Sequence, residues 1–365
     1  NADHPGWLGG LPIGIKDLDQ VKGVRTTFGT KAFENNIPES SEFFVETLEE
    51  RGGIVVGKTN TPEMGAGGNT FNDVHGTTRN PWDTSLNAGG SSGGAAASLA
   101  SGETWLSSGS DHGGSLRTPA AYCGVVGLRT SFERGTSSLT AGQSAGFIAE
   151  GVIGPMARSV RDCALFLDAM SAFNPRAPLS FPPPEVSFQD SVVQAETNVR
   201  IAYSPDLNGF SPVEREISEV LQQALGDVEK SGGTVEEACP DIPNLERTYH
   251  VIRAMGFAAG FSRAPKAITQ HFKQTLRENI DFASTLDISD VTAANLDRTT
   301  IFLNMHELLQ NFDVLACPVV GCMPRPVKIE WIDEINGQKL TNYMDWLKFA
   351  FLATTTGLPA ISVPV

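Results

Sequence analysis

The sequence predicts an α/β fold in which a β-sheet is covered by helices on both faces. Apolar runs of strand length alternate with stretches of helical periodicity along most of the 365 residues. A β-α-β unit is the clearest part of this alternation, with VRIAYSPD and TVEEACP as strands around a helix over Val213–Lys230. Hydrophobic residues make up 40% of the chain, which is enough for a large buried core.

The N-terminal part predicts one strand followed by a helix and a second strand. Leu11–Leu18 alternates apolar and small residues, which predicts a short buried strand ending near Lys16. Glu39–Arg51 is typical of a helix with serine N-cap candidates, ended by Gly52–Gly53 before the strand IVVGKTN. The side chains expected to face the core from this helix are those of Phe43, Phe44 and Leu48.

The next hundred or so residues alternate between glycine-rich loops and short regular elements. Residues 65–87 are rich in Gly, Asn, Asp and Thr, which indicates a loop covering a site. Ala95–Ala100 predicts a small-residue helix launched from a Gly-Ser turn, and residues 104–111 (TWLSSGSD) a strand. Residues 118–131 form a compact Pro/Gly stretch expected to wall a cleft, and a loop-rich section follows.

The second half predicts more helices than strands. Helical spacing of apolar residues predicts a core-facing helix over Met156–Phe173. Residues 243–284 carry helical periodicity with aromatics and are expected to form a substrate cap. Thr299–Asn311 predicts a helix, residues 312–320 (FDVLACPVV) a buried strand, and Tyr343–Thr356 a helix before the last strand.

Composition excludes several classes of protein. The net charge of −15 argues against nucleic acid or an anionic membrane as partner. Five cysteines without a CxxC pair argue against a disulfide framework or a structural zinc site, and they favour a reducing, cytoplasmic location. No apolar run reaches membrane-spanning length and no signal peptide is visible, while both ends of the chain look truncated.

One motif suggests nucleotide binding, but its context is reversed. Residues 52–59 (GGIVVGKT) match the phosphate-loop pattern GxxxxGK[ST]. That loop must follow a strand and open a helix, because its N–H groups and the helix N-terminus hold the phosphates. Here a predicted helix precedes the motif and its middle is a β-branched run, so we do not expect nucleotide binding.

Asn87–Arg117 contains two glycine-flanked serine clusters, GGSSGG and DHGGS. Ser115 follows two glycines, and successive glycine N–H groups can line an anion-binding concavity. A tetrahedral intermediate needs such donors, and each can contribute roughly 3 kcal/mol. The alternative is an ordinary glycine turn with a capping serine.

A serine nucleophile needs a base, and lysine suits this sequence better than histidine. His112 adjoins the serine but lies inside the expected N–H loop, and the other histidines belong to no recognisable motif. Lys16, at the end of its apolar strand, would act as a base if burial kept its amine neutral, with a hydroxyl of GGSSGG carrying the proton. The alternative for Lys16 is a charge that reaches the surface.

At this point the sequence resembles the amidase signature hydrolases. The similar segments are PIGIKD, GGSSGG with its spacing to Ser115, DHGGSLRTPAAYCGVVGLR, GPMARSVRD, DVLACP and GLPAISVPV. These motifs are ordered and span most of the chain. The resemblance implies a large mixed sheet covered on both faces and a single domain over residues 1–365. Independently of it, the proline-rich composition of residues 177–184 makes this segment the candidate for an internal boundary.

The resemblance also implies a Ser–Ser–Lys triad without metal or cofactor. Ser115 would be the nucleophile, Ser91 the proton relay after a cis peptide bond, and Lys16 the base. The implied oxyanion donors are the backbone N–H groups of His112, Gly113, Gly114 and Ser115. Ser92 and Ser110 would support the network, and Asp111 and Arg117 would brace the loop.

The sequence departs from the family pattern at a few positions. His112 stands where relatives carry a small or apolar residue, and we expect its ring to pack rather than narrow the pocket. Cys317 and Cys322 stand where relatives often have threonine, and we expect buried packing. Relatives carry further elements before the lysine and after the last motif, which leaves a homodimer interface open.

The function predicted is hydrolysis of a carboxamide on a small molecule, with aryl or acyl amides favoured. The nearest alternative is a glutamine-dependent amidotransferase component that works with partner subunits. Besides the nucleotide-binding protein considered above, a further alternative is a catalytically silent binding protein. Five aromatic residues are candidates for an apolar substrate pocket or for the core: Phe257, Phe261, Phe272, Trp331 and Trp346.

Overall fold

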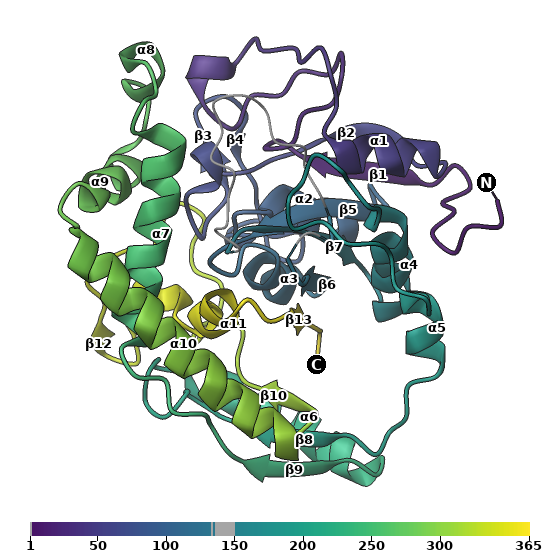
Figure 1. The fold of residues 1–365 in the computed structure, drawn as a ribbon, viewed down its shortest axis with the longest axis vertical. Helices are drawn as coiled ribbons and strands as arrows, with labels where there is room; N and C mark the ends of the chain where they lie inside the picture. Colours follow the sequence, from purple (N-terminus) through teal and green to yellow (C-terminus); the bar gives the residue numbers. More distant parts are fainter. Residues whose placement is uncertain (1, 133, 136–149) are drawn as a thin grey trace.

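A six-stranded mixed sheet forms the centre of the computed structural model, which describes residues 2–132, 134–135 and 150–365 (Figure 1). In spatial order its strands are β13 (Ala360–Ser362), β6 (Val126–Arg129), β7 (Val152–Ala157), β5 (Leu106–Asp111), β1 (Pro12–Lys16) and β2 (Ile54–Thr59). Strand β1 pairs in parallel with β2 and β5, and the remaining pairs are antiparallel. The α/β fold with a mixed sheet is confirmed.

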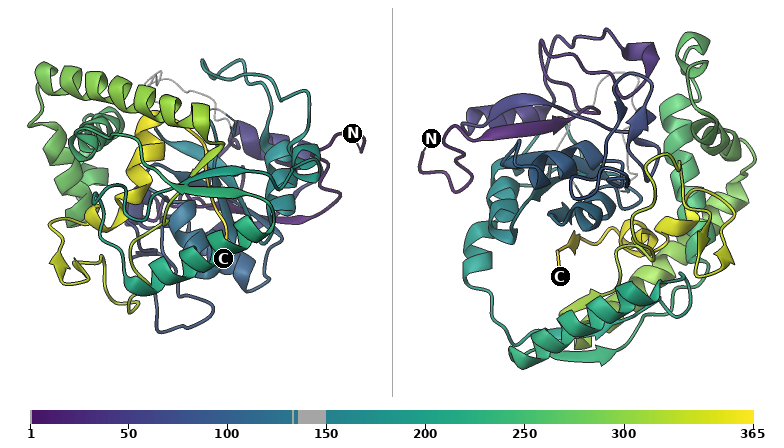
Figure 2. Two further views of the ribbon diagram at one scale, coloured as in Figure 1. Left: turned by 90° about the horizontal axis from the view of Figure 1, so that it is seen from below. Right: turned by 180° about the vertical axis from the view of Figure 1, so that it is seen from behind.

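Helices cover both faces of this sheet, as predicted. The covering helices are α1 (Phe43–Glu50), α4 (Val160–Met170) and α5 (Phe188–Val193) on one side, and α2 (Gly93–Ala100) and α3 (Arg117–Cys123) on the other (Figure 2). Successive residues of a strand point to opposite faces. Accordingly Met156 packs in the α2/α3 cluster, while Ala157 packs with Phe44 and Phe166 in the α1/α4 cluster.

A second, parallel sheet holds the predicted β-α-β unit. Its order is β10 (Val314–Ala316), β8 (Arg200–Tyr203) and β9 (Thr234–Glu237), with α6 (Arg215–Lys230) as the crossover. The prediction that residues 312–320 form a buried strand is wrong in its burial, because Val314 is 44% exposed. Strand β10 lies at the edge of this small sheet, where one side has no neighbouring strand.

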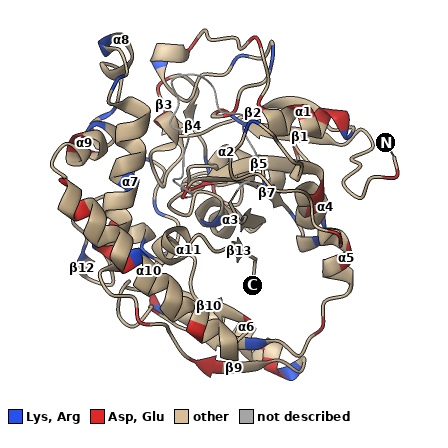
Figure 3. Cartoon of the chain, viewed as in Figure 1, with Lys and Arg blue, Asp and Glu red and all other residues tan. Residues whose placement is uncertain are grey.

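A helical layer lies beside the two sheets (Figure 1). Its first helices lie within residues 243–284, the segment expected to form a substrate cap. The layer consists of α7 (Leu245–Phe261), α8 (Lys266–Thr269), α9 (Gln274–Ala283), α10 (Ile288–Asn311) and α11 (Phe349–Thr356). Helix α10 begins well before the predicted Thr299, because Asp287 forms a capping box with Asp290. Lysine, arginine and acidic residues are scattered over these outer elements (Figure 3).

Other predicted elements also need correction, among them the helix predicted over Tyr343–Thr356, which begins only at Phe349. The helix predicted from Glu39 begins at Phe43 and has no serine cap, because the Ser41 hydroxyl accepts the Lys22 N–H instead (2.9 Å). Met156 belongs to β7, and α4 begins only after Ser159, whose side chain caps it. Residues 118–131, expected to be a compact Pro/Gly stretch, contain most of α3 and all of β6.

The remaining elements are short. They are the hairpins β3 (Phe71–Asn72) with β4 (Gly76–Thr77) and β11 (Glu334–Ile335) with β12 (Gln338–Lys339), and the 3-10 turns at Lys31–Phe33, Glu63–Gly65 and Asp345–Leu347. Most of the predicted loop-rich section after residue 131 lies outside the described residues. None of the helices in the described part is long and apolar enough to cross a membrane. The single-domain organisation stays a prediction.

Candidate active site

The candidate residues meet at one edge of the large sheet. Lys16 is the last residue of β1 and Asp111 the last residue of β5, and these two strands run parallel. The carboxyl ends of parallel strands share an edge, which is where open α/β sheets hold their ligands. The Gly-Ser turn before α2 and the loop between β5 and α3 reach the same edge.

Lys16 is completely buried and is surrounded by hydroxyl groups. Its Nζ lies 2.7 Å from Ser91 Oγ, 2.8 Å from Ser92 Oγ and 3.0 Å from Ser110 Oγ, and the residue is 0% exposed. The alternative of a lysine that reaches the surface is therefore wrong. No carboxylate lies within 4.0 Å of this amine in the described part of the chain.

Burial lowers the pKa of Lys16 to about 7, although the charges of Asp19 and Asp111 act to raise it. A neutral amine has two N–H donors and one lone pair, so one of the three hydroxyls donates to it when it is unprotonated. The Lys16 amine is thus held in a position where it can take up a proton from a serine near neutral pH.

The turn before α2 places Ser91 against this amine. The Gly90–Ser91 peptide bond is cis, as the resemblance implies. The glycines around it are required by close packing: a Cβ on Gly94 would lie 2.2 Å from the Asn60 backbone nitrogen, and one on Gly93 2.4 Å from Thr70 Oγ1. The sequence GGSSGG therefore reflects both the position of the serines and the tight approach of the neighbouring chain.

Ser115 lies in the loop between β5 and α3, next to the Ser91–Ser92 turn. The Ser92 N–H donates to the Ser115 carbonyl (3.1 Å), which ties the two loops together. Ser115 is half-buried, and its hydroxyl has no hydrogen-bond partner among the described residues. The structure thus brings Lys16, Ser91, Ser92 and Ser110 together by hydrogen bonds and holds Ser115 beside them through its backbone.

The four expected oxyanion donors are not equivalent. The Gly114 N–H donates to Asp111 Oδ1 (3.1 Å) and is already engaged. The N–H groups of His112, Gly113 and Ser115 have no acceptor among the described residues. Gly113 also borders a tight contact, because a Cβ there would lie 2.7 Å from the Tyr249 hydroxyl.

A buried ion pair supports this loop from below, as expected for Asp111 and Arg117. Arg117 donates to both carboxylate oxygens of Asp111 (2.8 and 3.1 Å), and Arg129 donates to the Asp111 carbonyl (2.8 Å). Burial acts against the Asp111 charge, but Arg117, with Arg129 and the Leu116 N–H, more than offsets it and holds the pKa of Asp111 well below its usual range. Sequence reasoning missed Arg129, whose only signal was a charge ending the apolar run VVGLR.

His112 packs, as expected. Its ring lies edge-on to Tyr249, and its Nδ1 is 3.2 Å from the Tyr249 hydroxyl. Burial lowers the pKa of His112 well below its ordinary value, so the ring is neutral. Cys322 is buried beside Tyr122, as expected, whereas Cys317 is only half-buried against the same apolar cluster. Burial raises the pKa of the free Cys317 thiol to about 12.

Asp19 is a buried neighbour of Lys16 that sequence reasoning missed. It is 6% exposed, and burial together with Glu42 raises its pKa to about 7. The Asp19 N–H donates to the Lys16 carbonyl (3.0 Å), which fixes the two residues relative to each other. A second acid two residues beyond PIGIKD was the available signal.

Of the five aromatic residues that were candidates for a substrate pocket, four pack in apolar clusters and one lines a cavity. Phe257, Phe261 and Phe272 form one apolar cluster, and Trp346 is buried in another, as the core alternative held. Trp331 lines a cavity of about 990 Å³ between α7, α9 and the segment before α11, together with Tyr343 and Met344.

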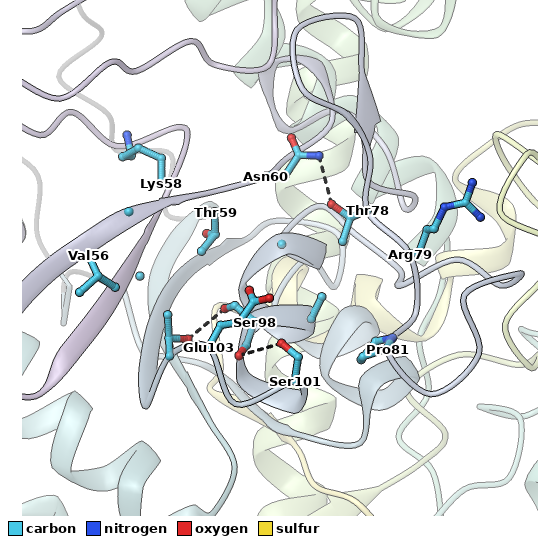
Figure 4. A pocket seen from close by; sticks show the side chains of 15 residues that line it. Val56, Lys58, Thr59, Asn60, Thr78, Arg79, Pro81, Ser98, Ser101 and Glu103 are labelled. Carbon is cyan, nitrogen blue, oxygen red and sulfur yellow. Dashed lines mark hydrogen bonds between the residues drawn. The ribbon is translucent and has the colours of Figure 1, made fainter.

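Another cavity, of about 630 Å³, lies between β2 and α2 and includes part of the phosphate-loop pattern (Figure 4). Its lining includes Thr59, Ser98 and Glu103, but not Lys16, Ser91 or Ser115, so we do not place the chemistry there. The Lys58 side chain extends away from Ser98 and donates to the Asp19 carbonyl (2.6 Å). Residues 54–59 form a strand rather than a loop, as the argument against nucleotide binding requires.

Comparisons with known proteins agree with the resemblance. The amidase family model matches residues 2–365. An acylamidase of Rhodococcus erythropolis is 35% identical over 98% of this chain and 75% of its own length. One of the subunits of the glutamyl-tRNA(Gln) amidotransferase of Pseudothermotoga lettingae is 32% identical over 97% of this chain and 79% of its own length. The crystal structure of a bacterial aryl acylamidase of the amidase signature family superposes with a TM-score of 0.89 at 27% identity, covering 98% of this chain and 76% of that one.

Proposed function

The chain belongs to the amidase signature family and is an amidohydrolase, and from this premise we propose that it cleaves a carboxamide through an acyl-enzyme on Ser115. Ser91 relays the proton and Lys16 is the base. The observation that carries the proposal is the Lys16 amine, fully buried and 2.7 Å from Ser91 Oγ. Ser92 and Ser110 hold the amine in place through the other two contacts.

In the acylation step, Ser115 Oγ forms a bond to the carbonyl carbon. Its proton passes to Ser91 Oγ, and the Ser91 proton passes to the neutral Lys16 amine. The carbonyl oxygen becomes an oxyanion, for which the free N–H groups of His112, Gly113 and Ser115 are the available donors. When the intermediate collapses, the C–N bond breaks and the departing amine takes the proton back from Lys16 through Ser91.

Deacylation repeats the route with water. A water oxygen bonds to the acyl carbon while its proton moves through Ser91 to Lys16. The second tetrahedral intermediate releases Ser115, which regains a proton, and the acid product leaves. Every proton that Lys16 accepts is returned within the same half-reaction, so the chain's own residues complete the cycle.

Aryl or acyl amides are the substrate class that we favour. The acylamidase of Rhodococcus erythropolis and the aryl acylamidase structure support this choice. A component of a glutamine-dependent amidotransferase is the second candidate, supported by the relative from Pseudothermotoga lettingae. Ammonia release from glutamine that appears only with partner subunits would favour the second candidate.

Two substitutions test the proposed triad. Ser115→Ala removes the nucleophile and is expected to abolish turnover of acetanilide and of a primary amide. Lys16→Ala is expected to lower kcat by about 10²–10⁴-fold, the range of general acid–base catalysis. Circular dichroism and thermal unfolding of each variant control for the fold. Near-native activity of either folded variant on every amide that the wild type hydrolyses would show that the triad is assigned wrongly.

A further inference from the structure

Arg253 is a buried arginine near the candidate active site with only neutral partners. It lies on α7, one turn after Tyr249, and is 8% exposed. Its Nε donates to Asn279 Oδ1 (3.1 Å) and its Nη2 to the Tyr343 hydroxyl (2.5 Å). The guanidinium also lies over the Phe257 ring, 4.7 Å from its centre.

No carboxylate compensates this charge in the described part of the chain, where Arg253 forms no ion pair within 4.0 Å. By contrast, the buried Arg117 pairs with Asp111 at 2.8 Å, and the half-buried Lys273 pairs with Glu330 at 3.3 Å. Burial acts to lower the pKa of Arg253, but the Tyr343 and Tyr249 hydroxyls raise it above its ordinary value. A permanently charged group buried without a counter-ion is unfavourable for stability, which points to a role in binding.

Helix α7, which carries Arg253, borders the loop between β5 and α3 that holds Ser115. Tyr249 contacts His112 Nδ1 (3.2 Å), and its hydroxyl lies 2.7 Å from where a Cβ on Gly113 would be. Met344, which follows the Arg253 partner Tyr343 in the chain, comes within 2.9 Å of the same point. The field of Arg253 reaches this loop, because after burial it is the largest influence lowering the pKa of His112.

We propose that Arg253 binds a carboxylate of the substrate, so that the preferred substrates are amides that also carry a carboxylate group. This inference rests on the proposed amide hydrolysis at Ser115. A guanidinium presents pairs of N–H donors that match a carboxylate. The contacts to Asn279 and Tyr343 use Nε and one N–H of Nη2 and fix its orientation, which leaves the Nη1–Nη2 end for the carboxylate. The carboxylate can belong to the acyl part of the substrate amide or to its amine part. These two possibilities predict different substrate preferences.

Matched pairs of substrates test the proposal. 4-Acetamidobenzoate and acetanilide differ by a carboxylate on the amine part, and succinamate and butyramide by one on the acyl part. We expect the wild type to prefer the anionic member of one pair. Arg253→Gln should lower kcat/KM for that member by about 10- to 100-fold, the contribution of hydrogen bonds to a charged group, and leave its neutral counterpart within about threefold.

Arg277→Gln is the matched control, because Arg277 is an exposed arginine on the neighbouring helix α9. It should leave both members of each pair unchanged. Equal losses on anionic and neutral substrates in folded Arg253→Gln would mean a structural role and would overturn the proposal. Arg253→Lys keeps the charge without the fork and should show an intermediate preference.

A binding measurement keeps the proposal testable if Arg253→Gln does not fold. In Ser115→Ala, which is expected not to turn amides over, the anionic member of one pair should raise the Tm more than its neutral counterpart at equal concentration, and equal shifts in both pairs would contradict carboxylate binding. This measurement needs no turnover, so it tests carboxylate binding independently of the proposed hydrolysis at Ser115. Acetanilide hydrolysis that survives Ser115→Ala defeats the proposed mechanism but not carboxylate binding. Absence of any anionic preference defeats carboxylate binding alone.

Discussion

The protonation state of Lys16 connects its environment to a measurable rate. Burial lowers the pKa of this amine to about 7, and Asp19 raises it. Since only the neutral amine accepts a proton, kcat/KM should increase as the pH rises through about 7 and reach a plateau above it. Asp19→Asn removes the charge that raises the pKa and should shift the rising limb to lower pH. A pH profile that does not move, or moves to higher pH, would contradict this account. The apparent value belongs to the Lys16–Asp19 pair.

For single residues, the sequence predicted which residues belong to the candidate site better than it predicted the groups that they contact. Lys16 and Ser115 were predicted from a terminal strand residue and a glycine-flanked cluster, and the family resemblance singled out Ser91 within GGSSGG. Lys16 and Ser91 lie in contact. The engaged Gly114 N–H and the unpaired Arg253 were not predicted. Each depends on a group distant in the chain or on a loop conformation, namely Asp111 for the first and Tyr343 for the second.

At the scale of elements, long periodic stretches were predicted well and short buried ones poorly. The β-α-β unit around α6 was found because its amphipathic helix is long. Helix α3 was missed because six of its seven residues are buried, so no polar face marks it. Met156 was assigned to a helix because it lies near the end of a buried strand, β7, that stops only a few residues before the start of α4.

The ion pair that connects β5 to α3 gives a stability prediction. Arg117→Met leaves the buried Asp111 carboxylate with weaker compensation from Arg129, 3.6 Å away. The free energy of unfolding should fall by about 3 kcal/mol, the lower end for breaking a buried pair. Urea denaturation measures this, with Arg215→Met as control. Arg215 forms an exposed pair with Glu219, and its loss should cost at most about 0.5 kcal/mol. Equal effects of the two substitutions would show that the buried pair contributes no special stability.

At the scale of the whole molecule, the helical layer holds the Ser115 loop in place against the large sheet. Tyr249 of α7 contacts the His112 ring, and Thr354 of α11 donates to the His112 carbonyl. Tyr249 is in turn stacked on Phe351 with ring centres 3.7 Å apart, so α7 and α11 act as one rigid wall. The sequence could not predict this arrangement, because it depends on how two distant parts of the chain pack.

Gly113→Ala tests whether this wall sets the geometry of the loop. The added Cβ would lie 2.7 Å from the Tyr249 hydroxyl and 2.9 Å from Met344 Cε, and the stacked Tyr249 ring has little room to move. The loop must therefore shift, and kcat/KM should fall by about 10²-fold, the effect expected when a catalytic group is misplaced by about 1 Å. Gly57→Ala is the control, because nothing lies within 4 Å of a Cβ there. Full activity of Gly113→Ala would mean that the α7 contact does not set the geometry of the loop. If activity is lost and the double variant Gly113→Ala/Tyr249→Phe partly regains it, the Tyr249 hydroxyl is the group with which the new methyl collides.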